Sequence, residues 1–334
     1  MKDRYTNKKI NYSIQLLRLI LSLWVVIHHC YKYSYKYRKG LFPVPTFIIM
    51  SFYFYYNVLN KKDIFKINQR FQRILIPYIF WPIILFIFNN ILFKLSRFSL
   101  YNKKFLLIDF IVQLIFGQKI NYLFYYQFNL IFLTLLFTII SFLFNKSFNL
   151  IFQILLIISY IFQYSYLNIN FFEKYSNIIK ISLGHISEFI PFAVMGVTLC
   201  HLDIITKLKK FKGLTIIYIV IIFILILQFD IFTGIKGCYY PGVIYNIGGN
   251  CIFILFSLFS FQNEKLISLL KIITKFTGGI YYNHWTFFSI LERKFLFIRN
   301  KTFHGSITIY LISHIFCCLG NKLTFNTNLK FLFN

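Results

Sequence analysis

Long apolar runs separated by short polar gaps make up almost the whole of this chain. Crossing a bilayer takes about 20 predominantly apolar residues in a helix. Ten runs are candidates for such helices: Ile14–Tyr31, Leu41–Leu59, Ile74–Phe93, Tyr122–Phe144, Phe148–Tyr164, Ile186–Leu202, Leu214–Phe229, Gly242–Phe261, Gly278–Leu291 and Ser306–Gly320. The pattern therefore predicts an all-α, polytopic integral membrane protein with about ten transmembrane helices in a single bundle.

Three shorter stretches complete the layout. Phe105–Gly117 is apolar but short and carries Asp109, which predicts an interfacial or re-entrant helix. The loop Tyr31–Gly40 mixes Tyr and Lys, as expected at a membrane interface. The basic start Met1–Lys9 leads into an apolar run without a small-residue cleavage site, so we expect that run to stay as an anchor. With no internal repeat or soluble segment, residues 1–334 are predicted to form one domain.

Composition supports the membrane class and limits the partners. Hydrophobic residues make up 58% of the chain, and the mean hydropathy is +0.66. The net charge of +27 comes from Lys and Arg in the gaps between apolar runs. These residues are expected to contact anionic lipid headgroups, or alternatively to form a basic entrance to a site for a phosphorylated donor. No nucleic-acid partner is expected. The distribution of Lys and Arg slightly favours cytoplasmic N- and C-termini, and we expect the cell membrane as the location.

The first predicted helix carries ionisable groups near both of its ends. Arg18 and His29 are eleven residues apart, which is close to three helical turns, so they share one face to within about 20°. His28 is rotated about 100° away from that face. Charged groups in a bilayer are costly and normally face a cavity or a partner. The alternative is that Arg18 and His29 extend to opposite interfaces.

At these residues the sequence resembles the acyltransferase-3 family, whose members are membrane O-acyltransferases. The family's first helix carries an Arg and then, after ten residues, a His taken to be catalytic, which Arg18 and His29 match. "FIIMSFYF" is similar to the family's second-helix segment at Ser51, although Phe52 stands where Gly is usual.

The resemblance continues further along the chain and covers roughly Asn11 to Phe333. "QRFQRILIPY" matches the family's paired arginines with Arg70 and Arg73, and "GGIYYNHWTFF" resembles a late helix with His284 at the histidine position. The resemblance implies transfer of an acyl group, acetyl in the first instance, from acyl-CoA to a hydroxyl of a glycan or lipid-linked sugar.

Acyl transfer to a hydroxyl requires a base, a positioned donor and stabilisation of charge. A neutral imidazole, with an ordinary pKa of about 6.5, is a suitable base. We therefore expect His29 to activate the acceptor hydroxyl directly, without an acyl-enzyme, with Arg18 on the donor's route. Arg70 and Arg73 are expected to bind coenzyme A phosphates in bidentate fashion; their alternative role is interfacial anchoring.

The remaining candidates carry open alternatives. Glu188, inside a predicted span, could orient His29 or another imidazole, or neutralise Arg18. His284 and Ser51 are candidate substrate contacts, and His284 could instead be an interfacial histidine beside Trp285. No HExxH, paired Cys and His ligands or Gly-rich phosphate loop occurs, so no metal is expected.

The favoured function is thus a membrane O-acyltransferase. The main alternative is a transporter or flippase for a lipid-linked glycan, because buried charges also mark substrate pathways. A third possibility, a non-catalytic membrane scaffold, gives no reason for Arg18 and His29 to share a face.

Overall fold

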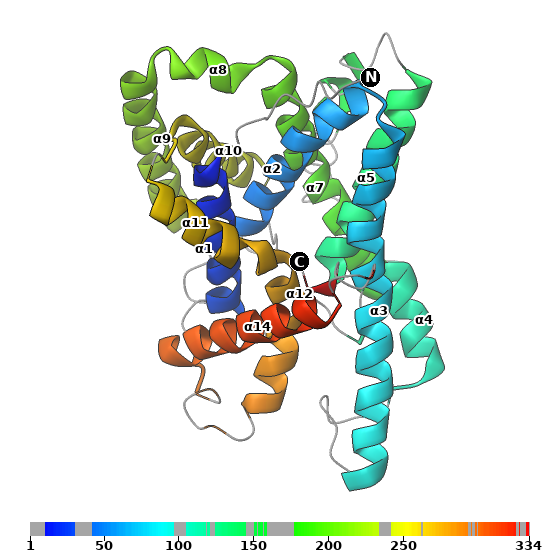
Figure 1. Cartoon of the computed structure of the whole chain (residues 1–334). Coiled ribbons are helices and arrows are strands. Elements are labelled where there is room, and N and C mark those ends of the chain that lie inside the picture. Colours follow the sequence, from blue (N-terminus) through cyan, green and yellow to red (C-terminus); the bar gives the residue numbers. More distant parts are fainter. Residues whose placement is uncertain are drawn as a thin grey trace, which may run out of the picture.

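In the computed structural model, every regular element of the described part is a helix, and that part contains no strand (Figure 1). The structure describes residues 11–30, 42–96, 105–117, 119–120, 124–144, 150–151, 153–155, 157–158, 177–233, 242–261, 263–292, 295, 298, 300–324, 327 and 332–333. The predicted all-α class is confirmed.

The elements follow one another in the order of the predicted apolar runs. They are α1 (Tyr12–Cys30), α2 (Pro43–Asn60), α3 (Ile64–Ser96), α4 (Leu107–Phe116), α5 (Tyr125–Leu143), α7 (Asn177–His201), α8 (Ile204–Lys209), α9 (Lys212–Thr233), α10 (Gly242–Leu258), α11 (Glu264–Ile273), the short 3-10 helix η5 (Thr274–Phe276), α12 (Thr277–Leu291) and α14 (Phe303–Leu323).

Length and hydropathy make this a multi-pass membrane protein. Four described helices are long and apolar enough to cross a bilayer, namely α1, α3, α5 and α14. Shorter apolar stretches lie in α4, α7, α9 and α10. The predicted bundle of about ten spans is not confirmed and stays a prediction. The loop Tyr31–Gly40, the start Met1–Lys9 and most of the predicted run Phe148–Tyr164 lie outside the described residues.

Helix α3 begins at Ile64, ten residues before the apolar run predicted from Ile74. Hydropathy marks the part of a helix that suits lipid, whereas the Lys, Gln and Arg that precede Ile74 are good helix formers in any solvent. Asp63 precedes the helix and accepts from Lys66 through Nζ (2.8 Å) and the backbone N–H (3.1 Å). These hydrogen bonds from Lys66 lower the pKa of Asp63.

Two prolines lie inside α3 without ending it. Pro77 has no N–H, so a carbonyl in the preceding turn loses its helical partner. The Gln127 side chain from α5 donates to the Ile74 carbonyl at 2.7 Å. The carbonyl that Pro77 leaves without its helical donor is that of Arg73, four residues earlier, so the Gln127 bond ties α5 to α3 beside the proline and does not replace the missing bond. Helix α3 nevertheless stays continuous.

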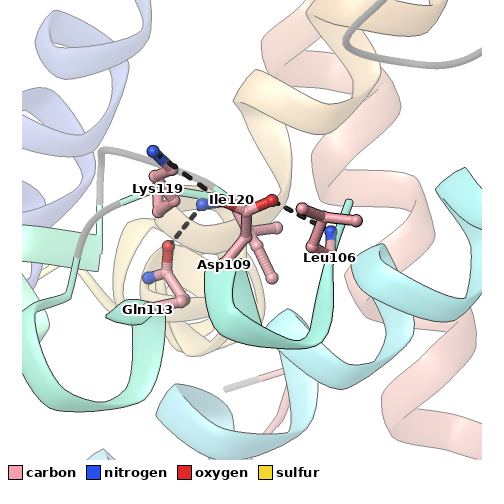
Figure 2. Close-up of polar contacts among 5 residues, drawn as sticks. All are labelled: Leu106, Asp109, Gln113, Lys119 and Ile120. Atoms are coloured by element: carbon pink, nitrogen blue, oxygen red, sulfur yellow. Dashed lines mark hydrogen bonds and ion pairs between the residues drawn. The ribbon is translucent and has the colours of Figure 1, made fainter. Parts of the chain in front are cut away.

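Helix α4 confirms that the apolar segment around Asp109 forms a short helix, and it lies beside α3 (Figure 1). Its ten residues span about 15 Å, half the hydrocarbon thickness. Figure 2 shows that Asp109 Oδ2 accepts from the Leu106 N–H at 2.9 Å, and that Asp109 Oδ1 lies 3.7 Å from Lys119 Nζ. Gln113 Oε1 accepts from the Ile120 N–H at 2.9 Å. These contacts satisfy polar groups at both ends of α4.

Helix α1 lies between two apolar cores and therefore carries its polar residues into the interior. One core joins α1 to α2, α5, α7 and α10. The second joins the C-terminal half of α1 to α12 and α14. Helix α14 runs across α12 and α1 rather than alongside them (Figure 1).

Candidate active site

Two imidazoles from opposite ends of the sequence lie against each other where α1 meets α12. The rings of His29 and His284 have centroids 5.6 Å apart and are inclined by 28°. His284 is fully buried and His29 is half-buried. Trp285 approaches the His29 ring edge-on at 6.2 Å, and His28 does so at 5.4 Å. A predicted catalytic residue and a predicted substrate contact are thus neighbours.

The hydrogen bond of His284 determines which of its nitrogens carries the proton. Nδ1 lies 3.1 Å from the Ile280 carbonyl oxygen, one turn earlier in α12. A carbonyl only accepts, so Nδ1 donates, and the neutral ring has its lone pair on Nε2. Nε2 is buried and has no hydrogen-bond partner among the described residues. A buried nitrogen in this state can accept a hydrogen bond from a bound hydroxyl.

Aromatic rings lead from this pair toward α5. The Tyr281 ring lies 6.1 Å from that of His284, and the Tyr126 ring of α5 lies 5.1 Å from that of Tyr281. Tyr126 interacts electrostatically with Arg70 of α3 and with Arg18 of α1. A track of neighbouring aromatic rings therefore leads from the histidines to Tyr126, and Arg70 and Arg18 lie within electrostatic range of its far end.

Three guanidinium groups gather at the Tyr126 end of this track. Arg18 is half-buried, donates from Nη1 to Gln15 Oε1 at 3.2 Å and is within electrostatic range of Arg73. Arg73 is exposed, one turn beyond the half-buried Arg70 on α3. Bringing like charges together in a membrane helix bundle is unfavourable unless an anion completes the site.

Arg70 is fixed by hydroxyl groups from two other helices. Its Nη2 donates to Ser51 Oγ of α2 at 2.9 Å, and its Nε donates to Thr134 Oγ1 of α5 at 3.2 Å. The buried ring of Phe52 lies 5.1 Å from the guanidinium carbon. Phe52 stands where the resemblance leads one to expect Gly, and here it offers a cation–π face to Arg70.

Glu188 is buried in α7. Arg18 donates to Gln15, and the role expected for Glu188 in neutralising Arg18 stays a prediction. The expected role of Glu188 in orienting an imidazole also stays a prediction.

Sequence patterns did not single out Tyr126, Tyr281 or Thr134. Tyr126 and Tyr281 belong to a chain with 25 tyrosines and follow no motif that separates them from the others. Thr134 offered a weak signal, because it is the one polar residue in "LIFLTLLF".

Ligand chemistry at the site rests on nitrogen and hydroxyl groups. Within the described ranges no three His, Cys, Asp or Glu side chains come close enough to hold a metal ion. The guanidiniums suit phosphate or carboxylate oxygens, and the imidazoles suit a hydroxyl.

Comparison with known proteins assigns the chain to a family. The family model described as an acyltransferase domain, that of the acyltransferase-3 family, matches residues 11–321 and so covers most of the chain. No curated protein and no solved structure matches the chain. The match begins one residue before α1 and ends within α14, so it includes the imidazole pair and all three guanidiniums. The chain therefore belongs to the acyltransferase-3 family and is a membrane acyltransferase that transfers groups other than amino-acyl groups.

Proposed function

We propose that this protein transfers an acyl group, acetyl in the first instance, from acyl-CoA to a hydroxyl of a glycan or lipid-linked sugar at the cell membrane. The observation that carries the proposal is the track from Arg18 and Arg70, through Tyr126 and Tyr281, to His284 and His29. It offers sites for a polyanionic donor at one end and a hydroxyl at the other. Family membership favours an enzyme, so the transporter interpretation is not carried further.

The proposed reaction is a direct transfer. His29 takes the proton of the acceptor hydroxyl as the oxygen forms its bond to the thioester carbonyl carbon. The carbon–sulfur bond then breaks, and the coenzyme A thiolate leaves and recovers the proton from the imidazolium. Arg70 and Arg73 hold donor phosphates, with Arg18 deeper on the same route. Ser51 and His284 are candidate substrate contacts, and Glu188 orients an imidazole.

Donor and acceptor are proposed to approach from opposite sides of the membrane. The eleven residues between Arg18 and His29 cover roughly 16 Å along α1. With the N- and C-termini cytoplasmic, acyl-CoA enters on the cytoplasmic side. In oriented vesicles, transfer is then expected only when acyl-CoA is supplied to the cytoplasmic side and the acceptor to the other. A requirement for both on one side would contradict this arrangement.

The test of the reaction is thiol release from acetyl-CoA by the full chain in lipid nanodiscs, with and without a carbohydrate acceptor. Replacing His29 by Ala is expected to lower kcat by about 100- to 10,000-fold, the usual contribution of a general base. The matched control is His304→Ala, because His304 is exposed at the start of α14. Full activity of a correctly folded His29→Ala protein would refute the role of His29 as base.

A further inference from the structure

The Arg70 guanidinium is held along one edge. Nε and Nη2 form the side edge of a guanidinium, and both donate to hydroxyls, Nε to Thr134 at 3.2 Å and Nη2 to Ser51 at 2.9 Å. The two hydroxyls come from α5 and α2, so Arg70 ties three helices together. This edge is therefore used within the protein.

The plane of the guanidinium is held as well. The Tyr55 ring lies 4.2 Å from the guanidinium carbon, and the Phe52 ring lies 5.1 Å from it. Tyr55 is itself fixed, because its hydroxyl shares a 2.8 Å hydrogen bond with Thr138 Oγ1. A long side chain that would otherwise sample many rotamers is thus restricted to one position.

The partners of Arg70 are all neutral. Among the described residues the ion pairs are Lys66–Asp63 and Lys119–Asp109, and neither involves Arg70. Arg73 follows one turn later on α3, and Arg18 lies within electrostatic range of Arg73 and of Tyr126, so these neighbouring charges are also positive. A half-buried cation that has no counter-charge among the described residues is stabilised by a bound anion. The Nη1–Nη2 edge remains available for two parallel hydrogen bonds to such an anion.

We propose that Ser51 and Thr134 are positioning residues that hold Arg70 so that its Nη1–Nη2 edge grips a phosphate of the acyl donor. This inference rests on the proposed function and changes the role of Ser51, which acts through Arg70 instead of contacting the substrate. The same oxyanion chemistry would also suit an anionic lipid headgroup, so the experiment must separate these two sources.

The experiment measures the affinity of unacylated coenzyme A for the full chain in phosphatidylcholine nanodiscs, together with the donor KM and kcat. Ser51→Ala and Thr134→Val are each expected to weaken coenzyme A binding and raise the donor KM about three- to tenfold, the net contribution of one typical hydrogen bond, because each removes a bond that positions Arg70 and not a direct contact to the donor. The value of kcat at saturating donor should change less than about twofold. Ser51→Thr and Thr134→Ser keep a hydroxyl and should restore affinity.

Ser141→Ala is the matched control. Ser141 lies two turns beyond Thr134 on α5, is buried, and donates only to a carbonyl of its own helix, that of Thr138, at 3.0 Å. This variant should bind coenzyme A as the unmodified chain does. Thermal unfolding of every variant separates loss of affinity from loss of fold.

A double-mutant cycle with Arg70→Lys tests whether Ser51 acts through Arg70. Lys has a single ammonium group and cannot bind Ser51 along one edge and a phosphate along another, as a guanidinium can. Ser51→Ala should therefore cause no further loss of affinity in the Arg70→Lys background. Additive losses would overturn the proposal, as would a Ser51→Ala effect confined to kcat or to the acceptor KM.

The lipid arm repeats the binding measurement in nanodiscs containing phosphatidylglycerol. If the anion is a lipid headgroup, Ser51→Ala will weaken phosphatidylglycerol retention and leave coenzyme A affinity unchanged, which would overturn the donor assignment. If the unmodified chain binds no coenzyme A, the proposed function itself fails. If the unmodified chain binds coenzyme A and neither the Ser51 nor the Thr134 variant changes that affinity, the positioning role is overturned and the proposed function stands.

Discussion

At the residue scale, the fixed tautomer of His284 gives this side chain two separate tasks. Nδ1 donates to the Ile280 carbonyl and anchors the ring, while buried Nε2 has no partner within the described part of the chain. An unsatisfied buried acceptor costs about 1–3 kcal/mol of stability. A substrate hydroxyl that donates to Nε2 would recover that cost on binding.

Replacing His284 by Asn separates the two tasks. The neighbouring Asn283 already donates to the carbonyl one turn earlier, that of Gly279, at 3.0 Å, so Asn at 284 can keep the anchoring bond. It cannot supply Nε2. We expect kcat/KM for the acceptor to fall at least about tenfold, with the donor KM unchanged. Steady-state kinetics with varied acceptor measures this.

The control for His284→Asn is His314→Asn. His314 is a partly buried histidine of α14 that packs against Phe276 (5.6 Å) and Tyr310 (6.4 Å), and its Nδ1 also lacks a partner among the described residues. It should keep full kcat/KM. An unchanged kcat/KM in folded His284→Asn would remove His284 from the substrate site.

At the element scale, the close packing of α2 against α7 holds the helix that carries Ser51. A Cβ added at Gly196 of α7 would collide with the Ile49 carbonyl oxygen and lie 3.0 Å from the Tyr53 backbone nitrogen. Backbone atoms cannot move aside as a flexible side chain can. Small residues at such crossings let membrane helices approach closely, so Gly196 sets the distance between α7 and α2.

Gly196→Ala is therefore expected to push the two helices apart and to lower the free energy of unfolding by about 1–3 kcal/mol, the usual cost of overpacking. Thermal unfolding in detergent or nanodiscs provides the measurement. Gly213→Ala is the control, because a Cβ at Gly213 near the start of α9 meets nothing within 4 Å. That variant should be neutral or slightly stabilised, since Ala favours helix. Equal stability of the two variants would contradict the close-packing argument.

At the scale of the whole molecule, several helix ends gather at one end of the bundle. The start of α1, the end of α2, the start of α3 and the helix α8 lie there (Figure 1). This end carries exposed lysines: Lys61, Lys66, Lys207, Lys209, Lys210 and Lys212. A concentration of Lys is typical of the cytoplasmic side, and Arg70 lies nearer this end than His29 does.

Cysteine labelling tests the orientation. Lys207→Cys in α8 should react with a membrane-impermeant maleimide only from the cytoplasmic side. Asn300→Cys should react only from the other side, because the adjacent Lys301 lies near Cys30 at the far end of α1. Labelling of the unmodified chain supplies the background from its native cysteines. Labelling of both variants from one side would overturn the proposed topology.

The local features of this protein follow directly from its amino-acid pattern. Long apolar runs dictate helices, because an α-helix satisfies all of its backbone hydrogen bonds within one segment and lipid offers no other partners. The spacing of Arg18 and His29 fixed their common face on α1, because helix geometry is local. The short helix around Asp109 followed from its length and its polar residues.

Which helices contact one another becomes clear from the packing of the folded chain. It brought His284 to His29 and placed Ser51 and Thr134 on Arg70. It also extended α3 ten residues beyond its apolar run. Lipid tails are as apolar as the side chains they face, so no hydrophobic pattern marks the inner face of a membrane helix. Close packing at Gly196 and hydrogen bonds between helices determine which helix faces pack together. Both depend on residues that are far apart in the chain.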